Sequence, residues 1–188
     1  MVKDDRIHIQ IPNARKVLME ALVDELGEQA QWLPEYEEIV DWMTDNHGKG
    51  LMCIGNCGRG KSLITQHLLP VIIHNHYNLV MNCYRAIDLQ DYDVDERGRA
   101  RLFYKTIARN KLLCIDDVGT EPAEARIFGE PHRFFSQLVD ECERKQKLLV
   151  CSTNLVKEEL LQHYDMRTFD RLTALTRRVW FKGKSLRS

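Results

Sequence analysis

The sequence has no long apolar run, no excess of one charge and no closely spaced cysteine pair. None of the apolar stretches in its 188 residues approaches membrane-spanning length, and residues 1–6 lack the apolar core of a signal peptide. We therefore expect no membrane association and a cytoplasmic location. The formal net charge of −1 argues against a general nucleic-acid coat protein but is compatible with a local basic patch.

The six cysteines include no C-x-x-C pair. Cys53, Cys114 and Cys151 lie in apolar, strand-like runs, where cysteine behaves as a small hydrophobe. Cys53 and Cys57 are four residues apart, but the glycine-rich loop between them must stay free for another ligand. We therefore expect reduced thiols rather than a zinc site.

Residues 55–62 match the phosphate-binding P-loop pattern G-x-x-x-x-G-K-S. An apolar run, 50–54, precedes the loop, and residues 63–69 follow it with helical spacing of apolar side chains. Strand, loop and helix are the context that this motif requires. The residues predicted to bind ATP or ADP are Gly55, Asn56, Cys57, Gly58, Arg59, Gly60, Lys61, Ser62 and Leu63.

The chemistry of the loop explains its composition. Glycines allow the backbone to form a nest of N–H groups, and the following helix directs its positive end at the same anion. Lys61 is expected to reach the β- and γ-phosphates, and the Ser62 hydroxyl to ligate Mg²⁺. The alternative is a glycine-rich turn that carries a lysine by chance.

A second apolar run, 111–115, ends in Asp116 and Asp117, as expected of a buried parallel strand opposite the phosphates. Asp116 is predicted to hold Mg²⁺ through water, and Asp117 to orient or deprotonate the attacking water. Many such ATPases have glutamate at the position of Asp117, so we expect slow hydrolysis. Glu121 is a weaker candidate for the same role. The alternative is a strand that ends in a solvated turn.

A third apolar run, 147–151, leads to Asn154, which we expect to contact the γ-phosphate or the attacking water. Capping of a turn is the alternative role for this asparagine. Because strands and helices alternate along the chain, the predicted fold is a parallel α/β sheet with ligands at the carboxyl ends of its strands.

The N-terminal segment is predicted to contain two helices. The first follows Asn13, a candidate N-cap, and ends at Gly27, and the second begins at Pro34. Before them, residues 7–11 suit either an edge strand or an extended arm. The helices either pack on the core or also contribute to an adenine pocket. The following helix should be interrupted near Pro70, and 78–84 should form a strand.

Two charged stretches stand out. Residues 91–101 have an acidic half and a basic half that contains Arg97, Arg99 and Arg101. They form either a solvated loop or a loop that faces nucleic acid. The tail from Asp165 to Ser188 is basic, and residues 179–181 should form a last strand.

The motifs GNCGRGKS, LLCIDDVGTE, LLVCSTNL, MRTFDRL and FKGKSLR stand in the order and spacing of the AAA+ ATPases of the DnaC/DnaI/IstB type. The chain resembles these helicase loaders and transposition helper ATPases over roughly residues 45–188. The resemblance implies a P-loop sheet in the order 5-1-4-3-2, flanked by helices. The chain departs from the family in that we expect little or no C-terminal lid. The resemblance divides the chain into an N-terminal helical segment, 1–45, packed on an ATPase core, 46–188.

The resemblance also implies roles for single residues. Asn154 corresponds to the sensor-1 residue, and Arg171, with Arg167 beside it, to the arginine finger that acts on ATP in a neighbouring subunit. Arg187 resembles a sensor-2 arginine. The implied partners are DNA, expected to be single-stranded, a replicative helicase or a transposase, and further copies of the chain in an ATP-dependent homo-oligomer.

Two other functions suit the same residues. A P-loop small-molecule kinase has a similar size and an arginine-rich lid, for which Arg97–Arg101 is a candidate, but it has no evident use for the STN and GKSLR motifs. A nucleotide-gated interaction module with negligible hydrolysis is compatible with Asp117.

Overall fold

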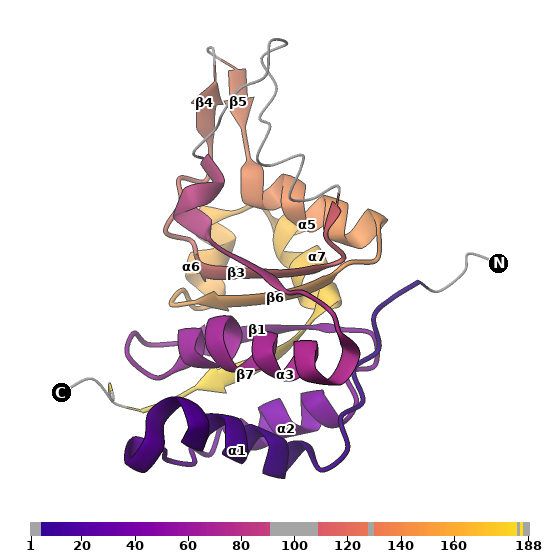
Figure 1. Ribbon diagram of the computed structural model, residues 1–188. Coiled ribbons are helices and arrows are strands. Elements are labelled where there is room, and N and C mark those ends of the chain that lie inside the picture. The colour runs from indigo at the N-terminus through magenta and orange to yellow at the C-terminus, as the bar shows by residue number, and fades with distance from the viewer. Residues whose placement is uncertain (1–4, 91–108, 128–129, 184, 186–188) are drawn as a thin grey trace.

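The computed structural model describes residues 5–90, 109–127, 130–183 and 185 (Figure 1). Its helices are α1 (Ala14–Leu26), α2 (Tyr36–Thr44), α3 (Leu69–Tyr77), α5 (Phe134–Arg144), α6 (Lys157–His163) and α7 (Met166–Leu175), with the shorter segments η1 (Gly27–Gln29), η2 (Leu63–Leu68) and η3 (Ala86–Gln90). Its strands are β1 (Gly50–Gly55), β2 (Asn82–Arg85), β3 (Leu112–Val118), β4 (Ala125–Ile127), β5 (Glu130–His132), β6 (Leu148–Thr153) and β7 (Thr176–Phe181). None of the described helices is both long and apolar enough to cross a membrane.

Five strands form one sheet in the order β2-β3-β6-β1-β7, and all neighbours are parallel. If the five strands of this sheet are numbered 1 to 5 in chain order, their order read from the β7 edge is 5-1-4-3-2, as expected. Parallel strands end at a common edge, so the carboxyl ends of β1, β6 and β3 meet there. The short antiparallel pair β4–β5, which the sequence did not predict, projects at the top of Figure 1.

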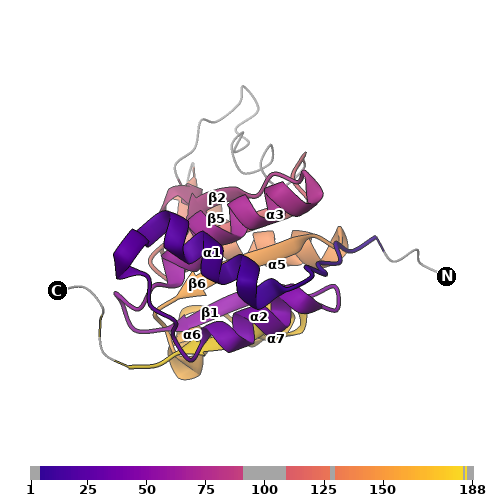
Figure 2. The ribbon, with the colours of Figure 1, turned by 60° about the horizontal axis from the view of Figure 1, so that its bottom comes forward.

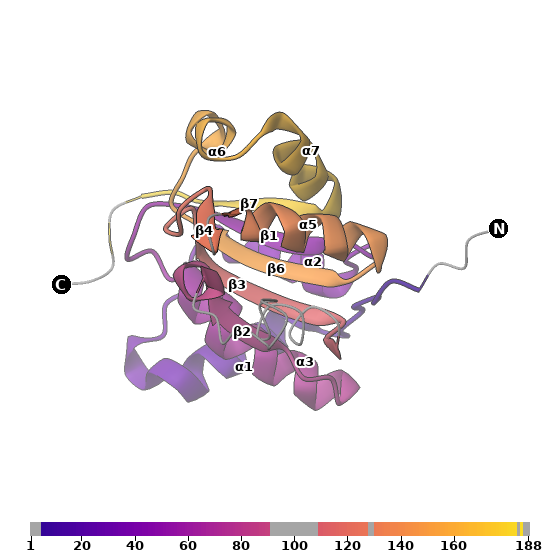
Figure 3. The same ribbon diagram turned by 90° about the horizontal axis from the view of Figure 1, so that it is seen from above.

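Alternate residues of the central strands face two separate apolar clusters. In β1, Leu51 and Cys53 belong to the cluster formed with α1, α2 and α3, whereas Met52 and Ile54 belong to the cluster formed with α5, α6 and α7. Figure 3 shows α5, α6 and α7 on one face of the sheet and α1 and α3 on the other. Because both faces are covered, the strands read as continuous apolar runs rather than alternating ones.

The N-terminal segment packs on the sheet, with α1 and α2 toward the viewer in Figure 2. Before them, buried Ile9 and Ile11 lie on an extended arm, not in an edge strand. The N–H of Asn46 donates to the carbonyl of Ile9 (3.2 Å), and that of Ile11 to the carbonyl of Met43 (2.9 Å). Asn13 precedes α1 as predicted, but its backbone is left-handed and its side chain forms no capping hydrogen bond.

Two predictions for the segment that follows the P-loop were wrong. The helix after the P-loop is not interrupted at Pro70, because η2, a π-helix, continues directly into α3 with the proline in its first turn. A proline there removes no hydrogen bond that the α-helix needs. The following strand starts at Asn82 rather than Asn78, because Asn78 ends α3 in a left-handed conformation.

Arg97, Arg99, Arg101 and Arg187 lie outside the described residues.

We expect Gly50→Ala to destabilise the fold by about 3 kcal/mol, near the upper end for overpacking, because a Cβ at this position would overlap the carbonyl oxygen of Leu149 in β6. Gly27→Ala is the matched control. An added Cβ there meets nothing within 4 Å, and only its φ of +56° penalises a side chain, which costs about 1 kcal/mol. Urea denaturation of both variants measures the difference, and equal losses would contradict the steric explanation.

Candidate nucleotide-binding site

A cavity of about 800 Å³ lies at the carboxyl ends of β1, β3 and β6. Its volume is within the range of small-molecule sites. The P-loop region and the strand ends contribute Cys57, Gly58, Gly60, Lys61, Ser62, Leu63, Asp117 and Asn154. The N-terminal segment contributes Leu26, Glu28, Gln29, Gln31, Leu33 and Tyr36. The segment therefore packs on the sheet and also lines this cavity, whereas its predicted contact with adenine stays a prediction.

The loop between β1 and η2 takes its shape from its glycines. Gly58 has a φ of 77° and Gly60 a φ of 88°, values that a residue with a side chain rarely adopts. Such turns bring successive backbone N–H groups to one side, which makes a concave binding site for anions. The helical segment η2, which begins at Leu63, continues directly from the loop.

Lys61 joins the ends of two strands. Its ammonium Nζ donates to the carbonyls of Gly55 (2.7 Å) and Asn56 (2.8 Å) and to Oδ1 of Asn154 (2.8 Å) beyond β6. Burial lowers the pKa of Lys61, and the nearby carboxylate of Asp117 opposes this shift. The lysine is thus held at the cavity with its three N–H bonds directed at protein oxygens.

Ser62 and Asp116 form the second contact of the site. The Ser62 hydroxyl donates to Oδ2 of Asp116 at 2.9 Å, and the Ser152 hydroxyl donates to Oδ1 of the same carboxylate at 2.5 Å. Asp116 is buried. Hydroxyl and carboxylate oxygens are the ligands that Mg²⁺ prefers, so these residues fit the ion, and Ser62 and Asp116 would hold it. The bound ion would neutralise phosphate charge.

Ser152 is a residue of the candidate site that the sequence analysis missed. It is fully buried in β6, two residues before Asn154, and its oxygen also accepts the backbone N–H of Asp117 at 3.0 Å. One side chain therefore positions both aspartates. The signal was present in the motif LLVCSTNL, because residues 152 and 154 of a strand share a face.

Asp117 lies at an irregularity in β3. The register with β6 shifts between Ile115 and Val118, and Asp117 has a φ of 54°. Aspartate tolerates this left-handed conformation better than most residues. The backbone turn places the Asp117 side chain in the cavity, where its Oδ1 lies 3.4 Å from Nδ2 of Asn154. The Asn154 amide thus lies between Lys61 and Asp117.

Glu121 does not share the position of Asp117, so its prediction as a second candidate for that role was wrong. Its side chain is buried, its Oε2 accepts the Gly119 N–H at 2.9 Å, and its Oε1 accepts the Tyr164 hydroxyl. Burial raises the pKa of Glu121. This residue holds the turn after β3 and does not line the cavity.

Arg59 connects the P-loop to the N-terminal segment, a link that the sequence analysis did not predict. Its Nε lies 2.8 Å from Oε1 of Glu35, and the two side chains are only 13% and 4% exposed. The next residue, Tyr36, packs edge-on against Phe181 at the end of β7, and burial raises its pKa to about 12. The loop is thus tied to the wall of the cavity.

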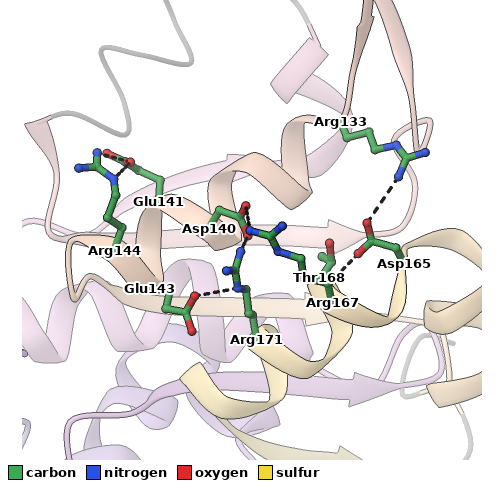
Figure 4. A network of polar contacts seen from close by, with 9 residues as sticks. All are labelled: Arg133, Asp140, Glu141, Glu143, Arg144, Asp165, Arg167, Thr168 and Arg171. Carbon is green, nitrogen blue, oxygen red and sulfur yellow. Dashed lines mark hydrogen bonds and ion pairs between the residues drawn. The ribbon is translucent and has the colours of Figure 1, made fainter.

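Arg171 lies apart from this cavity, on α7 against α5 (Figure 4). It forms an ion pair with Asp140, and its Nε lies 2.8 Å from Oε2 of Glu143. The hydrogen bond with Asp140 raises the pKa of Arg171. Arg167, one turn earlier, lies 3.5 Å from the same aspartate. The structure therefore brings together Lys61 and the strand-end residues, but not Arg171.

The fold is shared with AAA+ replication proteins of known structure. The DnaC helicase loader superposes with a TM-score of 0.64 and 16% identity, over 89% of this chain and 99% of that one. DnaI gives a TM-score of 0.61 and 16% identity, over 95% and 97% of the two chains. The replication initiator DnaA, bound to AMPPCP and single-stranded DNA, gives a TM-score of 0.56 and 16% identity, over 91% of this chain and 46% of DnaA.

No protein-family model matches the sequence, and the search of curated proteins found no match. The structural likeness identifies a DnaC-type AAA+ fold, which agrees with the resemblance seen in the motifs.

We expect Glu35→Gln to lower the free energy of unfolding by about 3 kcal/mol, because it leaves the Arg59 charge buried without its partner. Glu20→Gln breaks the exposed pair with Lys16 (62% and 74% exposed) and should cost less than about 0.5 kcal/mol. Chemical denaturation of both variants is the measurement. If both variants lose the same free energy of unfolding, the pair of Arg59 with Glu35 does not hold the loop.

Proposed function

We propose that the chain is an ATPase that binds ATP and Mg²⁺ in this cavity, hydrolyses ATP slowly and acts on DNA as an ATP-dependent oligomer. One observation carries the proposal. Three parallel strands and the loop after β1 gather two hydrogen-bonded groups at one end of the sheet, Lys61 with Asn154 and Asp117, and Ser62 with Asp116. Four of these residues, all but the buried Asp116, line one cavity. The AMPPCP bound to a protein of the same fold, DnaA, supports nucleotide as the ligand.

Each of these residues has a role that its position supports. Lys61 would exchange a protein oxygen for a phosphate oxygen and neutralise charge on the β- and γ-phosphates. Asp117 would accept a proton from the attacking water while Asn154 holds the water or the γ-phosphate. The water oxygen would bond to the γ-phosphorus as the bond to the leaving ADP oxygen breaks, and ADP and phosphate would result. Aspartate is shorter than glutamate, which supports slow turnover.

The N-terminal segment supports recognition of the base. It lines the cavity with the apolar side chains of Leu26 and Leu33 and with the amides of Gln29 and Gln31. An apolar wall with a few polar groups suits a planar ring that carries hydrogen-bonding edges, such as adenine. The segment 1–45 would therefore serve the ATPase core, 46–188, as part of its binding site.

Arg171 would act on ATP in a neighbouring subunit. Its distance from the cavity of its own chain supports this role, because a guanidinium that serves as an arginine finger must come from elsewhere. To do so, it would leave Asp140 and Glu143 when two copies assemble. The single-stranded DNA bound to DnaA and the loading role named for DnaC support DNA and a replicative helicase as partners, with a transposase as the alternative.

We expect Lys61→Ala to abolish nucleotide binding, and Asp117→Asn to retain binding but to lower turnover about a hundredfold or more. Asparagine tolerates the left-handed backbone of position 117, so the loss would come from the missing base. A fluorescent ATP analogue measures binding, and phosphate release measures turnover. Wild-type turnover no greater than that of Lys61→Ala would instead favour a nucleotide-gated module, and phosphate transfer to a small acceptor would favour a kinase.

We expect Arg171→Ala to bind ATP but to lose about a thousandfold in DNA-stimulated turnover. Arg144→Ala removes a neighbouring exposed arginine, paired with Glu141, and should leave turnover unchanged. The decisive measurement mixes Arg171→Ala with Lys61→Ala. A subunit of the second variant supplies the arginine to the intact P-loop of the first, so turnover should return in the mixture. If the mixture assembles normally in sedimentation but turnover does not return, Arg171 does not act on ATP in a neighbouring subunit.

A further inference from the structure

One face of the edge strand β7 carries an exposed aromatic side chain between two exposed cations. Within the described residues this strand lies at an edge of the sheet and has β1 as its one neighbour. Val179 and Phe181 are buried against the helices of one face, whereas Arg178 and Trp180 are exposed, as is Lys182 directly after the strand. Successive side chains of a strand alternate in direction, so Arg178 and Trp180 share one face.

Packing covers this tryptophan only in part. Its partner in the register is Ile54 of β1, which is buried under the helical layer of α5, α6 and α7. Trp180 itself remains 38% exposed, and among the exposed large hydrophobic side chains of the described residues it is the one aromatic. An aromatic ring that is partly exposed at a sheet edge offers a surface on which another planar group can stack.

The two cations have no ion pair or hydrogen bond within the described part of the chain. Other arginines nearby are neutralised: Arg177, the next residue but on the opposite face, lies 3.4 Å from Asp41, and Arg171 is held by two carboxylates. Arg178 and Lys182 therefore leave a local positive charge on a chain whose net charge is −1.

The spacing matches a single nucleic-acid strand. Arg178, Trp180 and Lys182 are two residues apart, which corresponds to about 6.6 Å between neighbours along an extended backbone. A splayed base can stack on the ring while the phosphates on either side meet the two cations. A duplex keeps its bases stacked inside and offers no free ring. A second copy paired along the same strand edge would bring like charges together.

We propose that the face of β7 formed by Arg178, Trp180 and Lys182, here called the β7 stripe, binds single-stranded nucleic acid, with a base on Trp180 and phosphates on Arg178 and Lys182. The proposal rests on the proposed function in one respect, that DNA is a partner. None of the three residues lines the nucleotide cavity, so the stripe acts independently of the ATP site.

Fluorescence anisotropy of labelled oligo(dT) and oligo(U) tests the stripe and distinguishes DNA from RNA. We expect Trp180→Ala to weaken binding about ten- to a hundredfold and Trp180→Phe, which can still stack, to retain most of it. Arg178→Ala should reduce the slope of log affinity against log salt by about one. Arg177→Ala, on the opposite face, is the matched control and should change affinity by less than about twofold.

Each contrary result has a distinct meaning. If oligonucleotides bind to the wild type but Trp180→Ala changes their affinity as little as Arg177→Ala does, the β7 stripe is not the binding site, and DNA remains a partner. If neither oligonucleotide binds to the wild type, the stripe and the DNA part of the proposed function both fail, whereas ATP turnover is judged separately. Loss of ATP-dependent assembly in Trp180→Ala, with oligonucleotide binding unchanged, would make the stripe a subunit interface. Binding of an ATP analogue by each variant confirms that it is folded.

Discussion

The site depends on the parallel pairing of β6 with β1 on one side and β3 on the other. All six residues of β6 are buried, and the strand brings Ser152 to Asp116 and, one residue past its end, Asn154 to Lys61. Side chains alternate along a strand, so a slip by one residue would turn Ser152 and Asn154 away from their partners. Burial of both faces prevents such a slip, because it would also exchange the two apolar clusters. The packing of the core therefore determines the geometry of the site.

The sequence predicted the parts of the site that have a regular periodicity. The loop at 55–62 and the strands that end near Asp116 and Asn154 lie where their apolar runs indicated. The sequence did not reveal the left-handed backbone of Asp117, because it results from a shift in register between two strands that are distant in the chain. Nor did it reveal the pairing of Arg59 with Glu35, because local patterns carry no information about contacts between distant charged residues. The wrong assignment of Glu121 has the same cause, since its contact with Tyr164 joins distant parts of the chain. Pro70 was misjudged for a local reason, because it falls in the first turn of α3, where a proline is tolerated.

The charges of the chain are distributed in a way that the near-zero net charge conceals. At the P-loop, Arg59 is buried with a carboxylate and acts as a structural link. On α7, Arg171 is paired but remains a quarter exposed, so a competing anion has access to it. Charge pairs of increasing exposure cost progressively less to break, from several kcal/mol for a buried pair to less than about 1 kcal/mol at the surface. The arginines thus range from one fixed in the fold to others that can change partners.

The pairing of β1 also has a consequence for the order in which the protein is made. This strand leads into the P-loop, but its partners in the sheet are β6 and β7, which begin only at Leu148 and Thr176. A ribosome releases the loop early, while the apolar strand before it has no neighbour to cover its edges. Sheets whose strands pair over such sequence separations form slowly and leave unpaired edges exposed in the meantime. The loop therefore becomes competent to hold a nucleotide only after β6 and β7, which are translated well after the loop itself, have paired with β1.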